Sequence, residues 1–157
     1  MTKRLTLTVQ EMHDHIVQLC GAFKIKLIED PTAQYEQGVS LNILDPRNFT
    51  AAAQAIIVRP VTDDASYCVA LHEIGHCAHP LGHSPHVTVL TREKAAWEWA
   101  RHHALCWTNA MEQCAQYSER DYEKRDAAER EKLALQQQQA VVDRAARKQF
   151  LKRLIKL

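Results

Sequence analysis

The residues best suited to chemistry are the run His72-Glu73-Ile74-Gly75-His76. Residues four positions apart point to the same side of a helix, so His72 and His76 can present two imidazole nitrogens to one zinc ion. Glu73 is one position further round the helix, where it lies beside the metal without binding it. From there its carboxylate can take a proton from water that the metal activates. The run therefore predicts a zinc centre for hydrolysis, with Glu73 as the catalytic base.

A catalytic zinc centre needs a third protein ligand, and two acids compete for that role on the next predicted helix. Glu93 lies in the middle of an apolar stripe, whereas Glu98 projects about 140° away, toward the polar side of the helix. The stripe is formed by Ala96, Trp97, Ala100, Ala104, Trp107 and Met111. A carboxylate buried without a partner costs several kcal/mol, and binding a dication removes that cost, so we predict Glu93 as the third ligand. The alternative is that Glu93 binds no metal and is only favoured by the helix dipole near the start of the helix.

Three further polar side chains are candidates to support the reaction. His79 follows His76 by one turn on the same helical face, where it either supports the ligands, faces the substrate or caps the end of the helix. Tyr67 or His103 can donate a hydrogen bond to the oxyanion of a tetrahedral intermediate. For His103, a position in solvent is the alternative.

Composition and charge narrow the class of protein. The 157 residues suffice for one domain with a core, and 20 basic and 19 acidic side chains leave a net charge of +1. This balance gives no overall field that attracts nucleic acid or an anionic membrane. Five cysteines form no CxxC pair, and their odd number cannot close fully into disulfides, which indicates reduced thiols. Because neither a signal peptide nor a membrane-spanning run is apparent, we predict a soluble cytoplasmic protein.

Caps and apolar periodicity predict the elements that must position these residues. They are a helix at 9–20, strands at 23–29, 39–44 and 56–61, a helix from 63 or 64 to about 80, and a long helix from 91 to at least 117. Thr8 and Glu11 form a capping box for the first helix, and Gly21 is predicted to end it. Thr91 is the predicted cap of the long helix.

From Ser118 onward the chain turns polar, and we predict that it stays helical. Supporting ion pairs are expected between Asp121 and Arg125 and between Asp126 and Arg130. The last fourteen residues contain six bases and no acid among apolar residues. The bases are Arg144, Arg147, Lys148, Lys152, Arg153 and Lys156. This basic amphipathic end indicates either a contact with nucleic acid, an anionic surface or an acidic protein, or a solvated helix with an oligomerisation seam.

A resemblance to a known family is carried by the HExxH run together with Glu93-Lys94-Ala95-Ala96-Trp97-Glu98-Trp99-Ala100. The chain resembles the ImmA/IrrE-like metallopeptidases over about residues 55–107. That family pairs an HE(L/I)GH helix with a downstream E-x-x-A-x-x-(F/W)-A helix, whose first glutamate is the third zinc ligand and corresponds to Glu93. The family often has Asn or Asp where this chain has Trp97. Members commonly occur in phages and other mobile elements, and some cleave a DNA-binding repressor. The resemblance therefore implies a protein substrate, such as a transcriptional regulator, in a host cytoplasm.

We therefore expect an α+β fold, with a minimal zincin-like domain at 1–117 and a charged helical extension at 118–157. The domain should contain an N-terminal helix, a small twisted sheet, the HExxH helix and the glutamate helix. The expected function is that of a zinc-dependent endopeptidase of the gluzincin type, acting on an intracellular protein. The alternative is a catalytically inactive zincin-like module that binds a partner through its basic tail.

Overall fold

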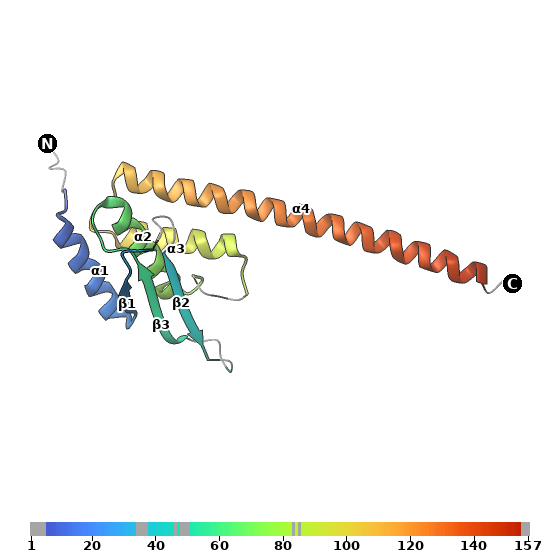
Figure 1. Ribbon diagram of the computed structural model, residues 1–157, viewed down its shortest axis with the longest axis horizontal. Coiled ribbons are helices and arrows are strands. Elements are labelled where there is room, and N and C mark those ends of the chain that lie inside the picture. Colours follow the sequence, from blue (N-terminus) through green and yellow to red (C-terminus); the bar gives the residue numbers. More distant parts are fainter. Residues whose placement is uncertain are drawn as a thin grey trace. The chain divides into compact units, whose positions relative to one another are not determined.

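The computed structural model describes residues 6–33, 38–45, 47, 51–82, 84 and 86–154. Within these ranges the chain forms four helices and a three-stranded mixed sheet (Figure 1), which confirms the predicted α+β class. In chain order the elements are α1 Val9–Phe23, β1 Lys26–Glu29, β2 Val39–Leu44, β3 Ala51–Val58, α2 Asp64–Ala78, α3 Val89–His103 and α4 Asn109–Leu154. The chain divides into two units, Met1–Arg120 and Asp121–Leu157, so α4 begins in the first unit and continues in the second.

The first helix begins where its cap predicts and ends later than expected. Thr8 and Glu11 form the reciprocal hydrogen bonds of a capping box, as predicted. The prediction that Gly21 ends the helix is wrong, because α1 continues to Phe23 and closes on Lys24, whose backbone is left-handed with φ 57°. A glycine inside a helix costs only about 1 kcal/mol, and burial of the neighbouring Cys20 helps to offset that cost. The following strand therefore starts at Lys26 instead of Phe23.

The sheet has the order β1-β3-β2. β1 runs parallel to β3 with Lys26 opposite Ala55, and β2 runs antiparallel to β3 with Val39 opposite Ile57. The predicted bounds of β2 are confirmed, but β3 spans Ala51–Val58 instead of 56–61. Its first half is made of alanines and Gln54, which lack a strand signal and become strand by pairing with β2.

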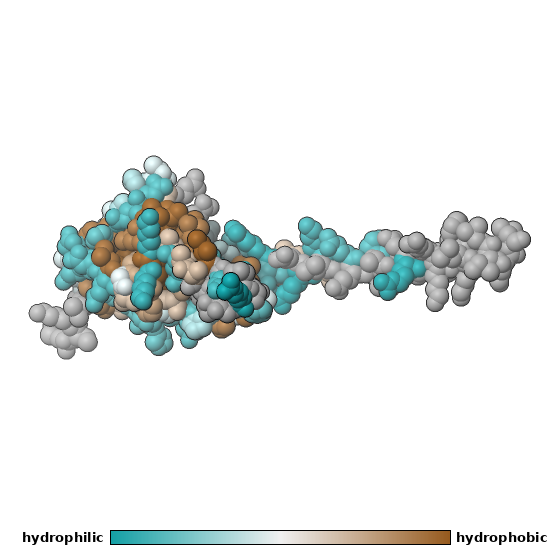
Figure 2. Space-filling model, turned by 90° about the horizontal axis from the view of Figure 1, so that it is seen from below, coloured by the Kyte–Doolittle hydropathy of each residue, from teal (hydrophilic) through white to brown (hydrophobic). Residues whose placement is uncertain are grey.

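One face of the sheet packs against helices and the other is open. α2 contacts β2, β3 and α1, and Ile56 and Val58 on the covered face are fully buried. On the open face Val39, Leu41 and Ile43 of β2 are 44%, 46% and 65% exposed, and apolar surface is visible on this unit in Figure 2. Among the described strands β2 has β3 as its single neighbour, so it is an edge strand.

The predicted long helix from 91 is in fact two helices. α3 begins at Val89 with Thr88 as its cap and ends at His103, and α4 begins at Asn109. The sequence between them contains no glycine or proline that would indicate a break. Tertiary contacts produce it instead, because the Leu105 N–H donates to the Tyr67 hydroxyl and Thr108 donates to Asp64 of α2.

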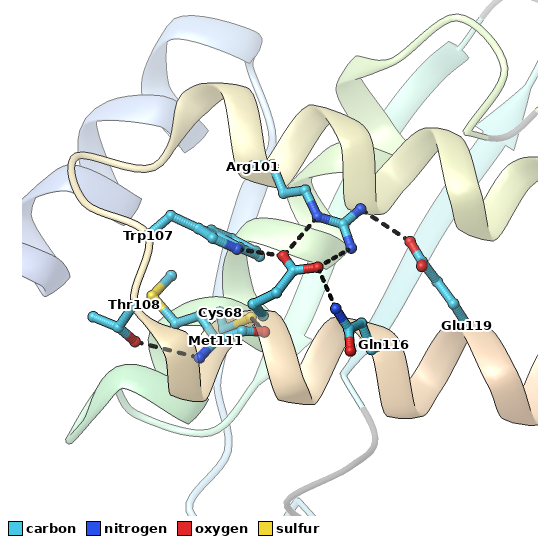
Figure 3. Close-up of polar contacts among 8 residues, drawn as sticks. Cys68, Arg101, Trp107, Thr108, Met111, Gln116 and Glu119 are labelled. Carbon is cyan, nitrogen blue, oxygen red and sulfur yellow. Dashed lines mark hydrogen bonds and ion pairs between the residues drawn. The ribbon is translucent and has the colours of Figure 1, made fainter.

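The first turns of α4 are fixed to α3 by a polar network (Figure 3). Arg101 of α3 donates to Glu112 through two nitrogens, at 3.0 and 3.3 Å, and to Glu119 at 3.0 Å. The Trp107 indole N–H also donates to Glu112, at 2.7 Å. Arg101 and these hydrogen bonds lower the pKa of Glu112 to about 2, so the carboxylate stays charged.

The second unit contains the continuation of α4, whose described side chains are mostly polar and exposed (Figure 2). Asp121 pairs with Arg125 at 2.7 Å and Asp126 pairs with Arg130, as predicted. Of the predicted basic end, the side chains beyond Arg144 and the whole of Lys156 lie outside the described residues. Among the helices described, none combines the length and apolarity that crossing a bilayer requires.

Candidate metal centre

Three buried side chains from two helices converge on one point. α2 carries His72 and His76, α3 carries Glu93, and each residue is less than a tenth exposed. The Nε2 atoms of the two histidines are 3.1 Å apart. Glu93 Oε2 lies 3.2 Å from His72 Nε2, and Glu93 Oε1 lies 3.4 Å from His76 Nε2. With one ligand atom from each residue, all within 4.8 Å of one another, the group could hold a metal ion.

The convergence depends on a close approach of α2 and α3. A Cβ added to Gly75, in the middle of the HExxH run, would lie 2.5 Å from the backbone oxygen of Ala96 on α3. That distance is too short for any side chain, so a glycine is required where the two helices touch. Because Gly75 is next to His76 and Ala96 is one turn after Glu93, this contact brings the ligands of the two helices together.

A hydrogen bond of His76 determines which of its two ring nitrogens faces the other candidate ligands. Its Nδ1–H donates to the carbonyl oxygen of Gly82 at 2.9 Å, so Nε2 carries the lone pair that faces the other ligands. Gly82 itself is packed on α2, since an added Cβ would lie 2.6 Å from the carbonyl oxygen of Gly75. The loop after α2 therefore fixes the tautomer of one ligand.

The donor set fits a metal ion. His72 Nδ1 and Glu93 Oε2 are buried without a hydrogen-bond partner, which is costly unless another interaction compensates. Two imidazole nitrogens and a carboxylate that point at one another repel unless a proton or a metal ion lies between them. A metal ion held by these two histidines and the glutamate would remove both costs.

The charge states of these ligands favour a cation as well. Burial alone would raise the pKa of Glu93, but the two adjacent imidazoles outweigh it and lower the pKa to about 2. Burial likewise disfavours the charged form of His76, yet Glu93 and Glu73 raise its pKa above the usual value. Protons and a metal ion would compete for the same imidazole nitrogens, so the affinity for a metal ion should fall at low pH.

Glu73 lies beside this group but outside the ligand set. It is 6% exposed, and burial raises the pKa of its carboxyl group, although His72, His76 and a hydrogen bond with Ser40 act in the opposite direction. Gly38, just before β2, packs directly on it, since an added Cβ would lie 2.3 Å from Glu73 Cγ. A buried carboxylate whose pKa is raised is a stronger base than one in water, as general-base catalysis requires.

The three supporting residues predicted from the sequence lie outside the metal-binding group. His79 is the residue after α2 with extended backbone, and its Nδ1 accepts the N–H of Leu81 at 3.1 Å, so it shapes the turn. Tyr67 precedes His72 by five residues, about 140° round the helix, and its hydroxyl lies 2.7 Å from His15 Nδ1. His103 follows Glu93 by ten residues, a rise of about 15 Å along α3, and stacks on Trp99. None of the three belongs to the metal-binding group found among the described residues.

Three residues that pack on or bind Glu73 and His76 were not predicted from the sequence: Gly38, Ser40 and Gly82. Isolated glycines in loops were the available signal, because they often mark close approach of backbone to another group. The exposed position of Glu98 and the burial of Glu93 agree with the helical-face argument.

Comparison with known proteins adds no relative. No protein-family model matches the chain, and no match was found among curated proteins or solved structures. The resemblance to the ImmA/IrrE-like metallopeptidases therefore stays a prediction.

Proposed function

We propose that the protein is a zinc-dependent endopeptidase built on a minimal zincin-like domain. The single observation that supports this most is the buried convergence of His72, His76 and Glu93 with a second buried carboxylate, Glu73, beside it. The two carboxyl groups lie close together yet have opposite pKa shifts: the pKa of Glu93 is lowered and that of Glu73 is raised. Such a separation is typical of a site where one carboxylate binds a cation and the other moves protons.

His72, His76 and Glu93 would hold the ion. When bound, zinc supplies a Lewis acid that polarises a carbonyl group and makes water a nucleophile near neutral pH. Glu73 takes the proton of the attacking water on its carboxylate and then gives it to the nitrogen of the leaving amine. The burial of Glu73 serves both steps, because a raised pKa makes the carboxylate a better base and lets its acid form exist long enough to return the proton.

The position of β2 favours a peptide as the substrate. β2 is an edge strand with exposed Val39 and Leu41. Gly38, just before β2, and Ser40 within it both contact Glu73. An extended peptide can pair with such an edge as an additional strand, which would carry its backbone past the catalytic base. From the resemblance to the ImmA/IrrE-like metallopeptidases we further propose that the substrate is an intracellular protein such as a transcriptional regulator.

Substitution of Glu73 by glutamine tests the proposal. Wild type, Glu73→Gln and Glu98→Gln are loaded with zinc, assayed for metal content and incubated with a denatured proteome whose new amino termini are then identified. Glu98 is the matched control, because it is an exposed glutamate on α3. We expect one zinc in all three proteins, and cleavage lowered about 10²- to 10⁴-fold only in Glu73→Gln.

Two other outcomes contradict the proposal. Equal cleavage by Glu73→Gln and wild type would exclude Glu73 as the base. Full zinc in all three proteins with cleavage in none would favour a metal-stabilised binding module that acts through its C-terminal helix.

A further inference from the structure

The two histidine ligands are supported in different ways. His76 has a hydrogen bond from Nδ1 to the carbonyl of Gly82, whereas Nδ1 of His72 is buried without a partner. The ring of His72 instead stacks on the indole of Trp97, with centroids 4.0 Å apart and planes inclined by 23°. A hydrogen bond from the outer nitrogen is the usual way to fix a metal-binding imidazole. At His72 the indole face of Trp97 is in contact with the ring, and this hydrogen bond is missing.

Trp97 is itself held in place from the far side. It is 2% exposed, and its Nε1–H donates to Ser118 Oγ in α4 at 3.3 Å. Ser118 lies in the first unit of the chain, in the same turns of α4 that Arg101 fixes to α3. A continuous set of contacts therefore runs from α4 through the indole to a candidate metal ligand.

We propose that Trp97 is a positioning residue for the metal ligand His72, and that Ser118 in turn positions Trp97. The stack fixes the plane of the imidazole, so that Nε2 points at His76 and Glu93, while it leaves the Nδ1–H without an acceptor. His72 thus gains its orientation from an aromatic contact. The proposal rests on the metal centre of the proposed function, but not on peptidase activity.

Metal affinity measured on the full chain tests this role directly. Wild type, Trp97→Leu and Trp97→Phe compete with a chromophoric chelator for zinc, and the visible spectra of their cobalt(II) forms report ligand geometry. We expect Trp97→Leu to weaken zinc binding about 10- to 100-fold, the range seen when a supporting partner of a metal ligand is removed, and to change the cobalt spectrum. Trp97→Phe keeps a ring to stack on His72 and should lose far less.

Trp99→Leu is the matched control. Trp99 lies two residues further along α3, is 6% exposed and stacks on His103 with centroids 3.9 Å apart, but His103 is not a ligand. This variant should lose stability in urea as Trp97→Leu does, with zinc affinity and cobalt spectrum unchanged. An equal loss of affinity in both leucine variants would overturn the proposal, because it would show a general loosening of α3.

The role of Ser118 has its own test, which also serves if Trp97→Leu does not fold. Ser118→Ala and Trp97→Phe remove the two ends of one hydrogen bond, so each should weaken zinc binding about 2- to 10-fold and the double variant no more than either. Additive losses, or none, would overturn the link through Ser118. Absence of zinc binding by the wild type would instead refute the metal centre, whereas tight binding that Trp97→Leu leaves unchanged refutes only the positioning role.

Discussion

Alanine in place of Gly75 would show whether the contact between α2 and α3 sets the geometry of the metal centre. The new Cβ would lie 2.5 Å from the backbone oxygen of Ala96 and 3.0 Å from its Cα, whereas ordinary contact begins at 3.4 Å. The obstacle is backbone within a helix, so a side-chain rotation cannot relieve it. α3 must move by about 1 Å, and Glu93 moves with it.

The effect on stability should be small and the effect on metal binding large. Overpacking of this kind costs about 1–3 kcal/mol, but alanine in place of a helical glycine recovers about 1 kcal/mol, which leaves a net loss of about 0–2 kcal/mol. Metal sites tolerate errors of only about 0.2 Å in ligand distance, so a shift of about 1 Å should weaken zinc binding at least about 10-fold.

Gly21→Ala is the control for this substitution. Gly21 lies in α1, and a Cβ added there meets nothing within 4 Å. The same change should therefore raise the free energy of unfolding by about 0.5–1 kcal/mol and leave zinc affinity unchanged. Urea denaturation with a chelator present gives the stability, and chelator competition gives the affinity. Wild-type zinc affinity in Gly75→Ala would refute the claim that the helix contact positions Glu93.

Two further predictions concern the second unit and alkaline pH. Ending the chain after Arg120 should leave the urea midpoint and the zinc affinity unchanged. The reason is that the ligands and the residues that support them all precede Arg120, and the remainder forms a separate unit. A lower midpoint or loss of metal binding would show that the extension supports the fold. Burial raises the pKa of Tyr67 to about 12 and that of Cys20 to about 11, so the unfolded chain loses these protons first as pH rises. The free energy of unfolding should therefore fall from about pH 9 to pH 12, with about 2–3 kcal/mol due to Tyr67, and Tyr67→Phe should lessen the fall above pH 10 in urea titrations under reducing conditions. An unchanged pH profile in that variant would contradict the assignment to Tyr67.

Local chemistry in the sequence predicted the starts of α1 and α2 well. Thr8 and Asp63 are caps whose side chains bond to backbone N–H groups within three residues, so they mark the starts of α1 and α2 without help from the rest of the fold. The burial of Glu93 followed from helical periodicity over a single turn. Ala104, Trp107 and Met111 seemed to extend the same stripe, but they lie beyond the end of α3.

The remaining features depend on contacts that local sequence does not encode. The break after His103 is made by Tyr67 and Asp64, which are about 40 residues away in sequence. The early start of β3 comes from pairing with β2. Gly38 and Gly82 support the site because distant backbone happens to pass close to Glu73 and His76, and neither residue carries a side chain whose chemistry could signal this.

The three candidate ligands come from separate helices, His72 and His76 from α2 and Glu93 from α3. A bound ion would therefore act as a cross-link inside the fold. A ligand that binds only the folded chain adds about 4 kcal/mol of stability when its free concentration is a thousandfold above Kd. The abundance of the protein would then follow the supply of zinc, since chains that lack the ion would unfold more often and be degraded sooner.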